Sequence, residues 1–121
     1  MGSLTKRALG RLLRKGGTWP EDRIDTVWAQ FDQGTQRAIL RLYRDAGEPR
    51  LAGLGGALDK LEMPALVIWG QRDPWLGLEL GQGYAERLPR AGLERIGDGG
   101  HWPWLDRPAV VDRVAEFVNQ G

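Results

Sequence analysis

Apolar residues recur at helical spacing through the first half of the chain. Between Leu4 and Lys15, leucine and alanine repeat every three or four positions with basic residues between them, and two glycines end the pattern. The same spacing predicts helices over about 21–30 and 35–45. Glycines and a proline between positions 47 and 56 predict a break after these helices. Residues 1–58 are therefore expected to form short helices and loops without a strand.

The pattern changes after Met63. Residues 64–70 form an unbroken apolar run with β-branched residues and a final glycine, which is typical of a strand buried on both faces of a parallel sheet. A helix is predicted over 78–88, a second strand over 93–96, and then an amphipathic helix ending near Gln120. Asp106 stands where that helix would have its N-cap, with Pro108 in its first turn. The second half is thus predicted to be a β-α-β-α unit.

The composition excludes several classes of function. The 121 residues include no cysteine and one histidine, which excludes disulfides, a thiol nucleophile and a multi-histidine zinc site. We therefore expect no bound metal and no cofactor. No apolar run approaches the ~20 residues of a membrane helix, and no secretory signal follows the start. A cytoplasmic protein without a membrane partner is expected.

Charge is unevenly distributed along the chain. Residues 1–60 hold 11 Lys and Arg against 7 Asp and Glu (+4), and residues 61–121 hold 6 against 9 (−3), which sum to the net charge of +1. This asymmetry indicates two sub-regions. A basic amphipathic helix over 4–15 is compatible with a nucleic-acid or membrane contact. A helix packed on its neighbours, with solvated arginines, is the simpler interpretation, and no nucleic-acid partner is expected.

An aspartate and the only histidine follow the two predicted strands. Asp73 comes three positions after the first strand, and His101 comes five positions after the second. Connections between parallel strands are right-handed, so both strands end at one edge, where open α/β sheets carry their active sites. A carboxylate beside an imidazole fixes the tautomer, orients the ring and stabilises the imidazolium. Trp75, Trp102 and Trp104 offer apolar walls for such a site, although a purely structural Asp–His pair is the alternative.

Three segments in series resemble the C-terminal third of an α/β-fold hydrolase. They are PALVIWGQRDPW at 64–75, YAERLP at 84–89 and GHWPWLDRP at 100–108. This superfamily orders its catalytic residues as nucleophile, acid and histidine. The resemblance covers about residues 62–120 and implies that Asp73 is the acid and His101 the general base. It implies an α/β fold in which residues 59–121 are the C-terminal part of the hydrolase core.

Residues 1–58 correspond, by position and helical texture, to the helical cap of this family. Such caps cover the site and shape the choice of substrate. Tyr43 is therefore a candidate for the substrate pocket, as are Trp19 and Trp28. For each of the three, packing in the core is the favoured alternative.

The sequence departs from the family where the nucleophile is expected. The 121 residues contain neither a Gly-x-Ser-x-Gly elbow nor its aspartate counterpart, and the only serine is Ser3. The chain is therefore interpreted as a fragment. Because two parallel strands cannot cover themselves, it is expected to need the missing N-terminal half, or self-association, for stability.

The predicted function is hydrolysis of an ester or a related bond in a small-molecule substrate by the intact protein. The chain alone is predicted to be inactive, because its nucleophile is missing. Haloalkane, epoxide, lactone and carbon–carbon bond substrates stay open for the same reason. The alternative is a non-catalytic remnant or interaction module that associates with a partner chain.

Overall fold

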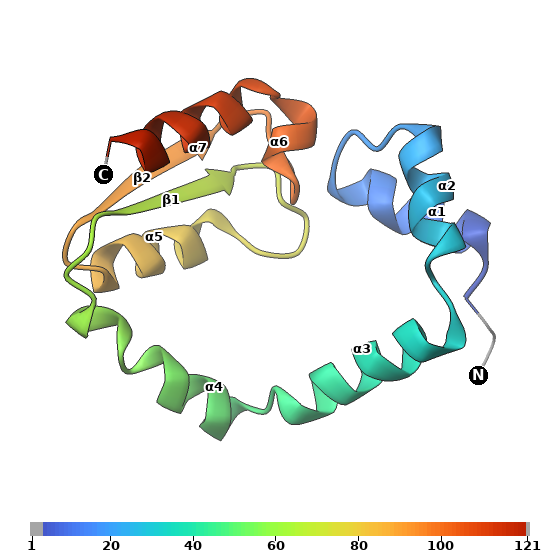
Figure 1. Cartoon of the computed structure of the whole chain (residues 1–121), viewed down its shortest axis with the longest axis horizontal. Helices are drawn as coiled ribbons and strands as arrows, with labels where there is room; N and C mark the ends of the chain where they lie inside the picture. Colours follow the sequence, from blue (N-terminus) through green and yellow to red (C-terminus); the bar gives the residue numbers. More distant parts are fainter. Residues whose placement is uncertain (1–3, 121) are drawn as a thin grey trace.

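The computed structural model describes residues 4–120, in which helices precede a small α/β unit (Figure 1). The first part contains α1 (Lys6–Gly16), α2 (Glu21–Ala29), α3 (Gln33–Asp45), α4 (Glu48–Gly55) and the 3-10 turn η1 (Leu58–Lys60). The second part contains β1 (Ala65–Gly70), α5 (Leu78–Arg87), β2 (Ala91–Ile96), α6 (Pro103–Asp106) and α7 (Ala109–Asn119). This order confirms the predicted sequence of helices followed by β-α-β-α, with the short α6 added.

The sheet consists of two parallel strands. Its register runs from Ala65 opposite Ala91 to Gly70 opposite Ile96, so both strands end at the same edge. Helices α5 and α7 lie on opposite sides of this sheet (Figure 1). Within residues 4–120, β1 pairs with β2 alone, so its other edge has no strand partner.

Helix α4 corrects the prediction of a break over 47–56. Gly47 has the extended backbone of an N-cap, and Glu48 and Pro49 occupy the first turn. Proline fits that turn because its missing N–H has no partner there, and glutamate favours the positive end of the helix dipole. Each internal glycine costs about 1 kcal/mol relative to alanine, which weakens a helix without preventing it.

The predicted N-cap role of Asp106 is wrong. Asp106 is the last residue of α6, and α7 begins at Ala109 after Pro108 without a side-chain cap. Pro103 begins a separate short helix two positions after the histidine, so the chain turns once more than the pattern predicted. The carboxylate of Asp106 therefore points to other partners, described below.

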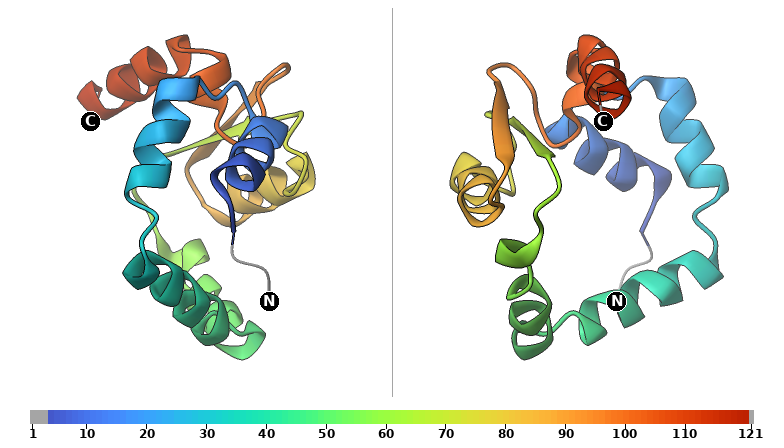
Figure 2. Two further views of the ribbon diagram at one scale, coloured as in Figure 1. Left: turned by 90° about the vertical axis from the view of Figure 1, so that its right-hand side faces the viewer. Right: turned by 60° about the vertical axis from the view of Figure 1, so that its left-hand side comes forward.

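Most of the buried core lies between α1 and α2. Ile24 is 1% exposed and packs with Leu9 and Leu13, and Trp19 and Trp28 pack against this cluster. The favoured core interpretation of these two tryptophans is confirmed. Helices α3 and α4 form an arc that leads from α2 back to the sheet (Figures 1 and 2). No helix in residues 4–120 is long and apolar enough to cross a membrane.

Candidate active site

The loops that follow the two strands are held together by backbone hydrogen bonds. Gln71 donates its N–H to the carbonyl of Ile96 at 3.0 Å, and Arg72 donates to Gly99 at 2.9 Å. Gly70 permits this close approach, because a Cβ atom there would come closer than 3.0 Å to the backbone of Gly99. The glycine that ends the first strand therefore lets the aspartate loop and the histidine loop meet.

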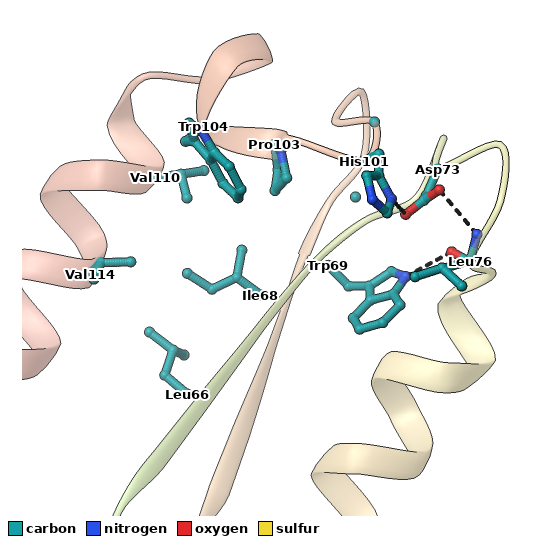
Figure 3. A pocket seen from close by; sticks show the side chains of 12 residues that line it. Leu66, Ile68, Trp69, Asp73, Leu76, His101, Pro103, Trp104, Val110 and Val114 are labelled. Atoms are coloured by element: carbon teal, nitrogen blue, oxygen red, sulfur yellow. Dashed lines mark hydrogen bonds and ion pairs between the residues drawn. The ribbon is translucent and has the colours of Figure 1, made fainter. Parts of the chain in front are cut away.

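Asp73 and His101 are in direct contact at this edge (Figure 3). Oδ2 of Asp73 lies 2.7 Å from Nδ1 of His101. Oδ1 accepts the N–H groups of Trp75 at 2.9 Å and Leu76 at 3.0 Å. The Asp73 side chain is 6% exposed, whereas the His101 side chain is 30% exposed. The aspartate is thus fixed by its own loop and holds an imidazole that solvent and ligands can reach.

The hydrogen bonds keep Asp73 charged. Burial acts to raise the pKa of its carboxyl, but the bonds from Trp75, His101 and Leu76 outweigh burial and hold the pKa below 3.8. The carboxylate is therefore an anion at neutral pH. With the proton of the imidazole on Nδ1, facing this anion, Nε2 is the nitrogen that is available as a base.

Two tryptophans enclose the imidazole edge to face. The ring centroid of His101 lies 5.0 Å from that of Trp75, at an interplanar angle of 83°, and 4.8 Å from that of Trp102, at 89°. These contacts restrict rotation of the imidazole and exclude water from its flanks. Trp75 and Trp102 thus lie against His101, where the sequence predicted apolar walls.

An apolar groove of about 420 Å³ extends from the Asp–His pair along β1 (Figure 3). Leu66 and Ile68 of β1 face Val110 and Val114 of α7 across this groove, and Trp104 also lines it. Sequence reasoning identified Trp104 but missed the aliphatic lining. The alternation of side chains along the strand could have indicated Leu66 and Ile68 as neighbours on one face.

Tyr43 does not pack in the core, which was the favoured interpretation, and its place in a substrate pocket stays a prediction. It is 79% exposed on α3 and does not line the groove. Helix α3, which carries Tyr43, lies apart from β1 and β2 (Figures 1 and 2). Ser3 lies outside the described residues. Residues 4–120 hold no group of three or more His, Cys, Asp or Glu side chains that could bind a metal ion.

The end of α1 also reaches the site, which the sequence did not predict. The carbonyl of Gly16 accepts the N–H of His101 at 2.6 Å. A Cβ atom on Gly16 would come closer than 3.0 Å to the rings of Trp75 and Trp102, so the backbone of α1 approaches the two tryptophans directly. The pair of glycines after the basic helix was visible, but it indicated only the end of that helix.

Comparison with known proteins finds hydrolases. No protein-family model matches the chain. Over 103 residues it is 34% identical to YugF, an uncharacterised hydrolase of Bacillus subtilis (strain 168), covering 81% of this chain and 36% of YugF. Over 65 residues it is 37% identical to the pimeloyl-[acyl-carrier protein] methyl ester esterase of Aromatoleum aromaticum (strain DSM 19018 / LMG 30748 / EbN1), covering 54% of this chain and 26% of the esterase. Epoxide hydrolases are also among its relatives.

A solved structure shares the fold. It is that of Est816, described as an N-acyl homoserine lactone degrading enzyme, with a TM-score of 0.52 and 19% identity, covering 93% of this chain and 46% of Est816. The fold is thus that of the C-terminal part of an α/β hydrolase, and the chain belongs to the α/β-fold hydrolase superfamily. It spans about a third or less of the length of the two curated hydrolases compared above.

Proposed function

We propose that Asp73 and His101 are the acid and the general base of a hydrolase site that cleaves an ester or a related bond. The contact of 2.7 Å between Oδ2 of Asp73 and Nδ1 of His101 carries this proposal. Its position supports the proposal too, because the pair lies where two parallel strands end and an apolar groove begins. Hydrolases among the relatives, including an esterase, agree with this chemistry.

In the proposed reaction, Nε2 of His101 accepts the proton of a hydroxyl nucleophile as that oxygen attacks the ester carbonyl. Asp73 stabilises the imidazolium that forms, and the imidazolium then protonates the departing alcohol. A water molecule, deprotonated by the same Nε2, attacks the covalent acyl intermediate. The bond to the nucleophile oxygen then breaks, the imidazolium returns its proton to that oxygen, and the acid is released. Where the nucleophile is a carboxylate, His101 acts on the water alone.

The nucleophile is proposed to come from polypeptide outside the 121 residues. No elbow motif is present in them, and the groove next to His101 is lined by β1, whose other edge has no strand partner within residues 4–120. A further parallel strand on that edge would end beside His101. Such a strand, supplied within a longer chain or by a partner, brings a strand-to-helix nucleophile within reach of Nε2.

Hydrolysis of a chromogenic short-chain ester tests the proposal. The chain is assayed alone and together with the part of YugF that lies outside the matched region. We expect little hydrolysis by the chain alone, hydrolysis by the combination, and a loss of about 10²–10⁴-fold with His101→Ala. Arg95→Ala, an exposed change on β2, is the control and should keep the activity.

Two outcomes contradict the proposal. Activity that survives His101→Ala cannot depend on the proposed base. Tight association of the two parts without hydrolysis of esters or epoxides favours the alternative, an interaction module without catalysis.

A further inference from the structure

The carboxylate of Asp106 joins two segments that meet at His101. Its Oδ2 accepts the N–H of Gly100 at 2.7 Å, and its Oδ1 accepts the N–H of Thr18 at 2.7 Å. Gly100 directly precedes the histidine, and Thr18 follows α1. One side chain therefore holds both the histidine loop and the segment that connects α1 to α2, although 88 positions separate it from Thr18.

Two successive backbone N–H groups that lead into His101 are fixed as a result. The N–H of Gly100 is held by Asp106, and the N–H of His101 is held by the carbonyl of Gly16 at 2.6 Å. Gly16 and Gly100 are in backbone contact, because a Cβ atom on Gly100 would collide with the carbonyl of Gly16. Loss of the Asp106 contacts would release both the histidine loop and the segment that follows α1.

We propose that Asp106 is a positioning residue for His101. Its carboxylate anchors the Gly100 peptide and Thr18, and through them keeps the imidazole within hydrogen-bond reach of Asp73 and between Trp75 and Trp102. It acts through the backbone and does not touch the reacting atoms. This inference rests on the proposed function of His101 as the base.

The chemistry of the contacts requires a carboxylate. Two N–H donors meet two acceptor oxygens, and hydrogen bonds to a charged acceptor are stronger than neutral ones. Burial acts to raise the pKa of Asp106, but the hydrogen bonds from Gly100 and Thr18 outweigh it and hold the pKa below 3.8. In Asp106→Asn, one oxygen is replaced by an NH₂ group that faces an N–H donor, so one of the two contacts must break.

A neighbouring aspartate provides a matched control. Asp98 lies on the same loop and pairs with Arg107, its Oδ1 atom accepting the Nε–H at 2.8 Å. Asp98→Asn removes the same charge near His101 but does not change the anchors of Gly100 and Thr18. Any effect of Asp106→Asn beyond that of Asp98→Asn therefore reports the backbone contacts.

The test is NMR on the full 121-residue chain, in which the single histidine gives one set of imidazole signals. In Asp106→Asn we expect upfield shifts of the Gly100 and Thr18 amide protons and displaced ¹⁵N shifts of the His101 ring, none of which occurs in Asp98→Asn. Asp106→Glu, which keeps both acceptor oxygens, should restore part of the wild-type shifts. Circular dichroism of each variant separates a local change from unfolding.

The outcomes separate this inference from the proposed function. Unchanged His101 and Gly100 signals in a folded Asp106→Asn chain overturn the positioning role and leave the acid–base proposal standing. Conversely, hydrolysis that survives His101→Ala overturns the acid–base proposal even where the NMR shifts occur. In the assay with the YugF part, Asp106→Asn is expected to lower kcat more than it raises KM, because it misplaces the base without removing a substrate contact.

Discussion

The carboxylate of Asp73 and the imidazole of His101 meet at 2.7 Å, although 28 positions separate them in the sequence. The parallel register explains this distance, because Gly70 and Ile96 end their strands side by side. Each residue then needs only a short loop to reach the common edge. The contact is therefore a consequence of the β-α-β topology, and it forms without a partner for the other edge of β1.

Asp73→Asn tests whether this carboxylate controls the imidazole. The substitution keeps the shape but removes the negative charge opposite Nδ1, so we expect the ¹⁵N signals of His101 to change toward a different mixture of tautomers. In a combination that hydrolyses esters, the loss of kcat should reach about 10⁴-fold, as for this substitution in other triads. Asp112→Asn on the exposed side of α7 is the control. An unaltered imidazole spectrum in Asp73→Asn would show that the carboxylate of Asp73 does not control the tautomer of His101.

Gly70→Ala is expected to destabilise the junction of the two loops. Its methyl group would come closer than 3.0 Å to the backbone of Gly99, which has little freedom to move. We expect a loss of about 1–3 kcal/mol in the free energy of unfolding, measured by urea denaturation. Gly92→Ala in the paired strand is the matched control, because a Cβ atom there meets nothing within 4 Å. Equal stability of the two variants would refute the steric role of Gly70.

Local patterns were sufficient to predict the elements that position the site. The apolar run at 64–70 and the amphipathic stripe after Pro108 each specify their own element, and the parallel pairing of a β-α-β unit brings Asp73 and His101 to one edge. The break predicted over 47–56 was wrong because Gly47 and Pro49 fit the N-cap and the first turn of a helix, and the later glycines weaken α4 without ending it before Gly55.

Contacts between the N-terminal helices and the sheet edge were not predictable from the sequence. The carboxylate of Asp106 accepts a hydrogen bond from the N–H of Thr18, and the carbonyl of Gly16 accepts one from the N–H of His101. Both hydrogen bonds depend on how α1 docks against the sheet edge. No periodicity encodes that docking. The exposure of Tyr43 was not predictable for the same reason, since a position within a helical segment does not define which direction its helix faces.

The stabilising effect of Asp106 should disappear in acid. The pKa of the Asp106 carboxyl is lower in the folded chain than its ordinary value of 3.8 in the unfolded chain. Between the folded and the unfolded pKa, the folded state therefore binds fewer protons than the unfolded state. The contribution is therefore complete above pH ~4–5 and is lost as the pH falls through the lowered pKa. We expect urea midpoints of wild type and Asp106→Asn to differ at neutral pH and to converge in acid. A difference that is independent of pH would mean that the charge of Asp106 does not stabilise the fold.

Ile24→Ala is expected to have the largest effect on the helical part of the chain. Ile24 is 1% exposed and packs with Leu9 and Leu13, in a cluster that holds three of the four buried apolar side chains of residues 4–120. Replacing a buried isoleucine by alanine costs about 2–5 kcal/mol. A core this small leaves little stability to lose, so we expect α1 and α2 to separate and the contact between Gly16 and His101 to break.

Ile39→Ala on α3 provides the comparison for Ile24→Ala. Ile39 is 37% exposed, and substitutions at such positions usually change stability by less than about 0.5 kcal/mol. Hydrogen exchange of the His101 amide is the informative measurement, because that N–H is bonded to Gly16 of α1. Faster exchange in Ile24→Ala than in Ile39→Ala shows that the packing of α1 on α2 holds the histidine loop. Equal protection in both variants would show that α5, α7 and the sheet order this loop without help from the N-terminal helices.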